Sequence, residues 1–291
     1  MRHHETPDEH QPMNTNTATH PTPVDGSLRT TLETRHTPSP PGALANALSF
    51  GWRALLKIKH TPEQLFDVVV TPIMFTVLFT FLFGGALAGS PQAYLQFLLP
   101  GILVQTVVFT SIYTGFTLNT DISKGVFDRF RSMPIWMPSP IVGAMVGDMV
   151  RYTTSGLIVV IIGLIMGYRP ETGVWGATTS ILLLNIFAFG IGWIFTTVAL
   201  AVRTPATVMT LSWLVMMPLT FASNIFVDPA TMPGWLQAFV AVNPIAHLVT
   251  AVRGLMDGVA TAGDIGLALF SPAVVTALCA PLAMWLYRRE R

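Results

Sequence analysis

The chain has 291 residues, of which 11% are charged and 51% are hydrophobic, and its net charge is +1. Soluble domains carry about 25% charged residues, so these charges are too few to cover the surface of a soluble fold. The composition therefore indicates an integral membrane protein, and the net charge excludes a generally basic nucleic-acid-binding protein. A single cysteine, Cys279, excludes a disulfide framework and a cysteine-rich metal site.

The first 42 residues are rich in Thr, Pro, His and Asn and have no periodic apolar face. Such a segment cannot bury enough apolar surface to offset the entropy cost of ordering, so we expect a disordered polar tail over residues 1–42. The tail lacks the apolar core of a secretory signal peptide. Five of the seven histidines lie in it, at irregular spacings that favour a solvated tail over a metal site.

The next segment, residues 43–60, has apolar side chains at helical spacing on one side and Arg53 and Lys57 on the other. Trp52 lies on the apolar side, and tryptophan is enriched at the headgroup level of bilayers. The pattern predicts an amphipathic interfacial helix on the cytoplasmic face, before the first membrane span.

Long stretches without charged residues follow, and the first runs for 53 residues between Asp67 and Asp121. A helix of about 20 apolar residues crosses the hydrocarbon core, so this stretch accommodates two spans, divided at the Gly and Pro residues around 84–91. The runs are too long and too continuously apolar for barrel strands, which indicates an all-α membrane protein. Six spans are expected, at 66–86, 95–119, 139–167, 175–201, 206–227 and 265–287.

The charge-free segment 229–252 is long enough to span but contains Pro233, Gly234 and Pro244. These residues interrupt helices and leave pieces too short to cross the bilayer, so we expect two short helices near 234–242 and 245–256 that re-enter the membrane. With six spans and cytoplasmic termini, ten Lys and Arg side chains lie inside and two outside. This distribution obeys the positive-inside rule, which a seventh span would violate at the C-terminus.

Sequence signatures of catalysis are missing from the chain. The phosphate-binding P-loop, His-Glu-x-x-His and Gly-x-Ser-x-Gly do not occur, so no enzyme activity is expected. Asp148 and Arg151 are three residues apart in the third span, close enough on a helix to pair. A mutually neutralising pair is the favoured interpretation, with a subunit or gating contact and a proton relay as alternatives. The scarcity of other acids within spans argues against an ion-coupled carrier.

The segment between spans two and three, residues 121–135, interleaves phenylalanines with charged residues. Phe127 and Phe130 alternate with Asp128, Arg129 and Arg131. A loop that only set the orientation of the protein would need positive charge but not two aromatic side chains. The mixture therefore favours a docking surface on the cytoplasmic side.

The run Gly125-Val-Phe-Asp-Arg-Phe-Arg-Ser-Met-Pro-Ile135 resembles the cytoplasmic loop of ABC-2 type permeases, specifically daunorubicin- and doxorubicin-resistance (Drr-type) export subunits. Other segments match the same group in the same order, and the resemblance covers about residues 43–288. These further segments are 62–67, 83–85, 94–101, Gly147-Asp148 with Arg151, 232–237 and 242–245 with Arg253.

The resemblance implies that residues 43–291 form an ABC-2 transmembrane domain in the plasma membrane, paired as a homodimer or heterodimer. A separate cytoplasmic ATPase subunit would bind ATP and Mg, and this chain would bind no cofactor or metal. The implied export substrate is an amphipathic drug-like polyketide of the anthracycline type. A permease for a lipid or glycoconjugate is the alternative, and an ATP-independent carrier or channel is the alternative of another class.

The resemblance also assigns residues to three regions. The ATPase-coupling loop comprises Lys124, Gly125, Phe127, Asp128, Arg129, Phe130, Arg131, Ser132, Met133 and Pro134. The connecting helix and the entry to the first span contribute Trp52, Arg53, Lys57 and Glu63. The extracellular hairpin comprises Pro233, Gly234, Trp235, Asn243, Pro244 and Arg253.

Overall fold

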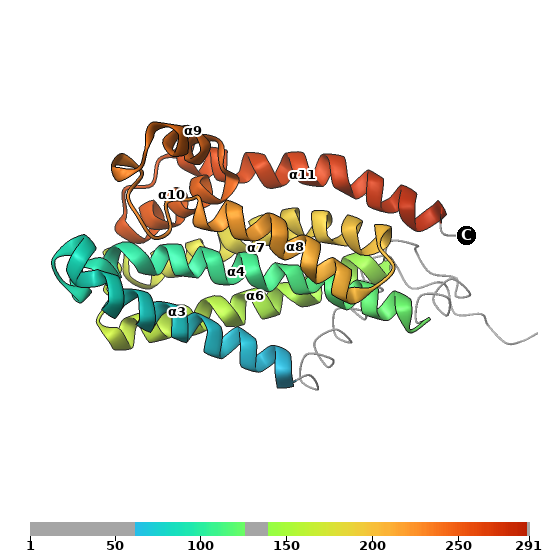
Figure 1. The fold of residues 1–291 in the computed structure, drawn as a ribbon, viewed down its shortest axis with the longest axis horizontal. Coiled ribbons are helices and arrows are strands. Elements are labelled where there is room, and N and C mark those ends of the chain that lie inside the picture. Colours follow the sequence, from blue (N-terminus) through green and yellow to red (C-terminus); the bar gives the residue numbers. More distant parts are fainter. Residues whose placement is uncertain (1–61, 126–138, 290–291) are drawn as a thin grey trace, which may run out of the picture. The chain divides into compact units, whose positions relative to one another are not determined.

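The computed structural model describes residues 62–125 and 139–289, which belong to the compact unit Pro40–Arg291. The expected tail over 1–42, the interfacial helix over 43–60 and most of the coupling loop lie outside the described residues. Within the described ranges the regular structure is helical, as expected (Figure 1). Its elements are α3 (Pro62–Ala88), α4 (Pro91–Ser123), α6 (Ser139–Met166), α7 (Gly173–Ala201), α8 (Pro205–Phe221), the short 3-10 helix η1 (Pro229–Thr231), α9 (Gly234–Val242), α10 (Pro244–Asp257) and α11 (Ala262–Arg289).

Helices α3, α4, α6, α7 and α11 are long and apolar enough to cross a membrane. Helix α8 has 17 residues, which gives a length of about 26 Å, slightly less than the roughly 30 Å of hydrocarbon. The expected span over 206–227 is therefore wrong at its end, because the helix stops at Phe221 and residues 222–227 are irregular. The two short helices expected near 234–242 and 245–256 are confirmed as α9 and α10, and the chain bends by 77° between them.

The turn between α3 and α4 contains fewer residues than the Gly and Pro cluster around 84–91 indicates, because only residues 89 and 90 separate the two helices. Helix α3 continues through Gly84 and ends at Ala88. Gly89 then adopts a left-handed φ of 72°, and the Ser90 hydroxyl caps α4 by accepting the Ala93 N–H. Gly84 is needed for proximity rather than for flexibility, since a Cβ there would lie 2.5 Å from Pro91 Cα.

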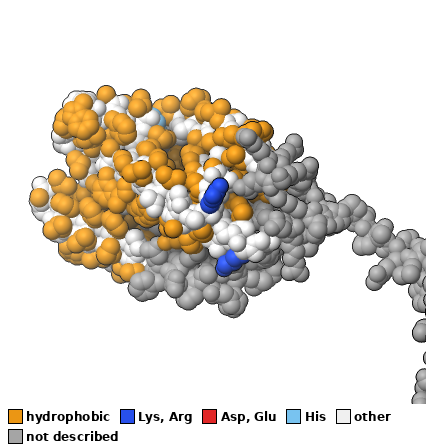
Figure 2. Space-filling model, turned by 45° about the vertical axis from the view of Figure 1, so that its right-hand side comes forward, with side chains coloured by type: hydrophobic (Ala, Val, Ile, Leu, Met, Phe, Trp, Pro, Cys, Tyr) orange, Lys and Arg blue, Asp and Glu red, His pale blue; other side chains and the backbone are white. Residues whose placement is uncertain are grey.

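Helix α4 is the centre of the bundle and packs against α3, α6, α7, α8 and α10. Helix α6 packs against α3, α4 and α7. A Cβ at Gly163 of α6 would lie 2.2 Å from a methyl carbon of Leu99 of α4, so this glycine permits the close approach of the two helices. By contrast, α11 packs mainly on α7 and α10 and presents apolar side chains such as Leu278 outward. Figure 2 shows one face of the molecule, on which hydrophobic side chains predominate among polar atoms and a few Lys and Arg side chains. An apolar exterior of this kind suits a lipid environment.

Both ends of the bundle can be followed in Figure 1. Helices α9 and α10 lie at one end, and the last residues of α11 lie at the other. Chain direction alternates through α3, α4, α6, α7, α8 and α11. The arrangement agrees with six crossings and with a hairpin that returns to the end from which it started.

Candidate functional site

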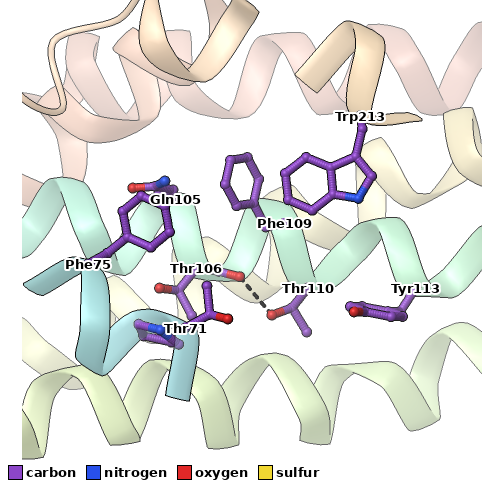
Figure 3. A pocket seen from close by; sticks show the side chains of 9 residues that line it. Thr71, Phe75, Gln105, Thr106, Phe109, Thr110, Tyr113 and Trp213 are labelled. Atoms are coloured by element: carbon purple, nitrogen blue, oxygen red, sulfur yellow. Dashed lines mark hydrogen bonds between the residues drawn. The ribbon is translucent and has the colours of Figure 1, made fainter. Parts of the chain in front are cut away.

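A cavity of about 60 Å³ lies between α3, α4 and α8. Most of its lining comes from one face of α4, where residues recur at spacings of three to five positions and so point the same way. Drug-sized pockets are typically about 300–1,000 Å³, so this cavity is too small to enclose a whole drug molecule. The lining residues, most of them labelled in Figure 3, are Thr71, Pro72, Phe75, Gln105, Thr106, Phe109, Thr110, Tyr113 and Trp213.

Aromatic rings supply much of the cavity wall. Phe109 of α4 and Trp213 of α8 are packed with ring centroids 4.7 Å apart and planes tilted by 58°. Phe75 of α3 stacks on Phe79 one turn along at 5.5 Å. Rings in such positions offer faces and edges on which another flat aromatic molecule can pack.

Gln105 is the unusual polar residue of this cavity. Its side chain is 2% exposed, and neither Oε1 nor Nε2 has a hydrogen-bond partner among the described residues. Leaving a buried amide unpaired costs about 1–3 kcal/mol. The nearby Thr110 hydroxyl, in contrast, donates to the Thr106 carbonyl at 2.7 Å, the hydrogen bond drawn in Figure 3.

Asp148 and Arg151 form the expected ion pair inside α6. The Arg151 Nη2 and Asp148 Oδ1 atoms are 2.9 Å apart, and the two residues are 4% and 6% exposed. Thr114 of α4 donates its hydroxyl to Asp148 Oδ2 at 2.6 Å, and a 2.6 Å hydrogen bond joins Thr114 to the Tyr152 hydroxyl. The pair thus ties α6 to α4, as a mutually neutralising pair would.

This network touches the cavity wall. The Arg151 guanidinium lies over the Tyr113 ring, 5.7 Å from its centroid, and Tyr113 lines the cavity. A cation over an aromatic face is attracted by the ring quadrupole. The ion pair therefore contacts the cavity lining through the ring of Tyr113.

The hairpin is held to the bundle by two of the residues that the sequence analysis assigns to it. Asn243 donates from Nδ2 to the Leu219 carbonyl at 2.7 Å and to the Ala222 carbonyl at 2.9 Å. Its Oδ1 accepts the Ile245 N–H at the start of α10. One side chain therefore caps α10 and satisfies carbonyls at the end of α8, which explains why α8 can stop inside the bundle.

Arg253 makes the second attachment. Its Nη2 donates to the Phe97 carbonyl at 3.1 Å and to the Asn224 carbonyl at 3.2 Å, and its guanidinium stacks 4.0 Å above the Phe97 ring. At the end of α10, burial raises the pKa of Asp257, and the charge of Arg253 lowers it in part.

The other assigned hairpin residues shape its helices. Pro233 precedes α9, Gly234 begins it and Pro244 begins α10. Trp235 is 74% exposed, a position suited to an anchor in the headgroup region.

Comparison with known proteins identifies the family. Residues 46–256 match the family described as ABC-2 type transporter. The chain belongs to the ABC-2 type transporter family. It is 46% identical over 269 residues, 92% of this chain and 95% of the relative, to the daunorubicin resistance ABC transporter permease protein DrrB1 of Streptomyces coeruleorubidus. The resemblance to Drr-type ABC-2 permeases is thereby confirmed.

More distant relatives cover most of the chain too. The probable doxorubicin resistance ABC transporter permease protein DrrC of Mycobacterium tuberculosis (strain ATCC 25618 / H37Rv) is 25% identical over 227 residues, 77% of this chain and 82% of the relative. The putative transport permease ycf38 of Porphyra purpurea is 26% identical over 207 residues, 69% and 70% of the two chains. The protein is thus a multi-pass membrane permease, the transport subunit of a system that uses an ATPase subunit.

The assigned coupling residues of this ABC-2 permease are described only in part. Lys124 and Gly125 directly follow α4, and Gly125 turns the chain with a φ of 68°. Glu63 lies in the first turn of α3. The remaining assigned residues lie outside the described ranges: Trp52, Arg53, Lys57, Phe127, Asp128, Arg129, Phe130, Arg131, Ser132, Met133 and Pro134.

Sequence reasoning missed the cavity and the partners of the ion pair. A signal was present in α4, where Thr106, Thr110 and Thr114 recur every fourth position and Gln105 lies beside them. Polar residues that recur in this way along a membrane span indicate an interior face. The identity of the opposing rings, Phe75 and Trp213, depends on how α3 and α8 pack and has no local signature.

Proposed function

We propose that this ABC-2 permease exports amphipathic aromatic compounds, of the anthracycline type, across the cytoplasmic membrane. The observation that carries the proposal is the 46% identity to a daunorubicin resistance permease over 95% of that relative. The aromatic cavity between α3, α4 and α8 supports it, because its rings can pack on a flat hydrophobic drug.

ATP hydrolysis on a separate cytoplasmic subunit drives this export. The coupling loop contacts that subunit through Asp128, Arg129 and Arg131, with Phe127 and Phe130 as apolar anchors. The loop continues directly from α4, which is both the central helix and the main wall of the cavity. Movement of the loop can therefore reach the cavity along one rigid element and switch the permease between inward- and outward-facing states.

Two permease chains, identical or related, assemble around the transport path. The small size of the cavity in one chain supports this arrangement, because a drug-sized compound needs a larger site. Both termini are cytoplasmic, so the coupling loop and the C-terminus share one side of the membrane and the α9–α10 hairpin covers the other.

Reconstitution tests the function directly. The permease and its ATPase are placed in inverted vesicles, and ATP-dependent accumulation of daunorubicin is followed by fluorescence, in parallel with a labelled phospholipid. We expect daunorubicin to accumulate and the phospholipid not to redistribute. Redistribution of the lipid alone would replace drug export with lipid transport, and uptake driven by an ion gradient without ATP would indicate a secondary carrier.

Coupling is tested by substitution in the loop. Arg129→Ala and Phe130→Ala should weaken co-purification of the ATPase or uncouple its hydrolysis from export, since truncating a desolvated charged contact costs about 2–5 kcal/mol. Arg129→Lys separates docking from orientation, because lysine keeps the charge but loses the planar fork of donors. An Arg129→Lys variant with full export at matched expression favours a loop that only sets orientation.

Topology is tested with a reporter fused after Arg291, which should be cytoplasmic. Single cysteines at Gln237 and Asp257, in a chain without Cys279, should react with impermeant thiol reagents added outside. An external reporter, or labelling from the cytoplasmic side alone, would overturn the orientation.

A further inference from the structure

We propose that the amide of Gln105 selects the ligand of this cavity: it favours flat aromatic molecules that carry a hydrogen-bond donor beside an acceptor on one ring edge. A lactam, or a hydroxyl next to a carbonyl, presents such an edge. The inference rests on the proposed function in that it names the chemical class that the exporter accepts.

Other amide side chains in the described ranges are paired. Seven further Asn and Gln residues have side-chain contacts in the described ranges, and each donates a hydrogen bond from its NH2 group to a backbone carbonyl or a hydroxyl. Most of these bonds tie one element to another, as when Asn119 of α4 holds the Ala199 and Val202 carbonyls at the end of α7. The seven are Gln92, Gln96, Asn119, Asn185, Asn224, Gln237 and Asn243.

Gln105 departs from this use. It is as buried as Asn119 or Asn243, yet both polar atoms of its amide lack a partner in the described part of the chain. Most amide side chains of this bundle join two elements, and Gln105 joins none among the described residues. An unpaired buried amide is therefore explained by a partner that arrives from outside the chain.

The amide of Gln105 lies among aromatic rings. Gln105 shares its cavity with Phe75 of α3, Phe109 of α4 and Trp213 of α8 (Figure 3). A flat ring system that packs on these side chains brings one edge to the amide. Because Oε1 accepts while Nε2 donates, the complementary edge has one donor and one acceptor side by side.

The size of the effect follows from burial. Gln105 is 2% exposed, so its amide is shielded from bulk water, and a ligand that lacks the matching edge leaves both sides unpaired. Sites built to hydrogen-bond a ligand reject the analogue without that group far more strongly than apolar pockets reject an extra methyl group. We expect at least about a tenfold difference in affinity between a ligand with the edge and one without it.

The experiment measures the binding of three tricyclic probes to the full permease with its ATPase in lipid nanodiscs. Phenanthridinone carries an N–H beside a carbonyl on one edge, N-methylphenanthridinone blocks the donor, and phenanthrene has no polar edge. Fluorescence titration should give at least about a tenfold preference for phenanthridinone over its N-methyl derivative in the wild-type protein. Gln105→Leu should remove this preference and leave phenanthrene binding equal or tighter.

Two variants keep the result interpretable. Gln105→Met repeats the test with a flexible side chain that fills irregular space, in case leucine packs poorly. Gln237→Leu makes the same chemical change at an exposed amide of α9, outside the cavity, and should leave the preference intact. An unchanged preference in both Gln105 variants, or no preference in the wild type, overturns the inference.

Failure of the inference differs from failure of the proposed function. If daunorubicin is exported with ATP while Gln105 has no effect on probe preference, export stands and the selection by Gln105 falls. If Gln105 governs probe preference but no drug is exported, the binding inference stands and drug export falls.

Discussion

Two polar sites are buried along α4. The polar atoms of one are hydrogen-bonded, and those of the other have no partner among the described residues. Toward the coupling loop, Thr114 joins the Asp148–Arg151 ion pair through a 2.6 Å hydrogen bond, and Tyr152 completes the network. Nine positions earlier, about 14 Å along the helix, Gln105 is equally buried but unpaired within the described residues. Both sites border the same cavity, one through Tyr113 and the other directly.

The difference separates architecture from ligand recognition. A paired network keeps α4 and α6 together, and its energetic worth lies in the bonds already made. An unpaired amide contributes nothing to holding the helices together, and its worth lies in a bond made only when a ligand is present. Substitutions at the two sites should therefore divide cleanly between loss of stability and loss of selectivity.

Breaking the paired site should have the largest effect on stability. Arg151→Met leaves the Asp148 carboxylate buried without its cation, which typically costs about 3–5 kcal/mol. We expect a marked drop in the thermal unfolding temperature in detergent. The double variant Asp148→Leu with Arg151→Met removes both charges and should recover much of the loss. An Arg151→Met variant as stable as the wild type would mean that the ion pair does not stabilise the fold.

The hairpin attachment should come next. Asn243→Asp keeps the acceptor that caps α10 but loses the donor for the Leu219 and Ala222 carbonyls. Leaving buried carbonyls unpaired costs about 1–3 kcal/mol, and we expect faster proteolysis near residues 222–227. Gln237→Leu, at an exposed amide of α9, is the control and should behave as the wild type. Equal proteolysis of the two variants would contradict the assigned role of Asn243.

Two glycines differ in how closely other parts of the chain approach them, and alanine substitutions test this difference. A Cβ at Gly101 of α4 would lie 2.8 Å from the Ile225 carbonyl oxygen, whereas a Cβ at Gly85 of α3 has nothing within 4 Å. Gly101→Ala should destabilise by about 1–3 kcal/mol, because the backbone of residues 222–227 must move. Gly85→Ala should stabilise by about 0.5–1 kcal/mol as an ordinary helix substitution. Chemical denaturation of both variants measures the difference, and a neutral Gly101→Ala would show that this segment yields easily.

Features set by neighbouring residues in the chain can be predicted from the sequence. The positions of Pro233, Gly234 and Pro244 predict α9 and α10 almost to the residue, because helix interruption is a property of these residues themselves. The spacing of Asp148 and Arg151 likewise predicts their pairing, since residues three apart on a helix face each other.

Features that depend on partners far away in the chain cannot be predicted in this way. Helix α8 stops at Phe221 rather than at residue 227, and the carbonyls at its end are satisfied by Asn243, which is 21 residues beyond Ala222 in the chain. In the sequence Gln105 is one of several polar residues of α4, and only the packing of α3 and α8 around it shows that its amide has no partner among the described residues. The pairing of a polar residue is a property of the fold, so no local pattern reveals it.

If Gln105 serves ligand binding and not the fold, its amide contributes nothing to the stability of the ligand-free permease. The most direct test is the free energy of unfolding of Gln105→Leu, measured by denaturant titration without ligand. An unpaired amide replaced by an apolar side chain of similar size should leave the stability unchanged or raise it by about 1–3 kcal/mol. A loss of more than about 1 kcal/mol would show that the amide already has a structural partner, and would contradict the account.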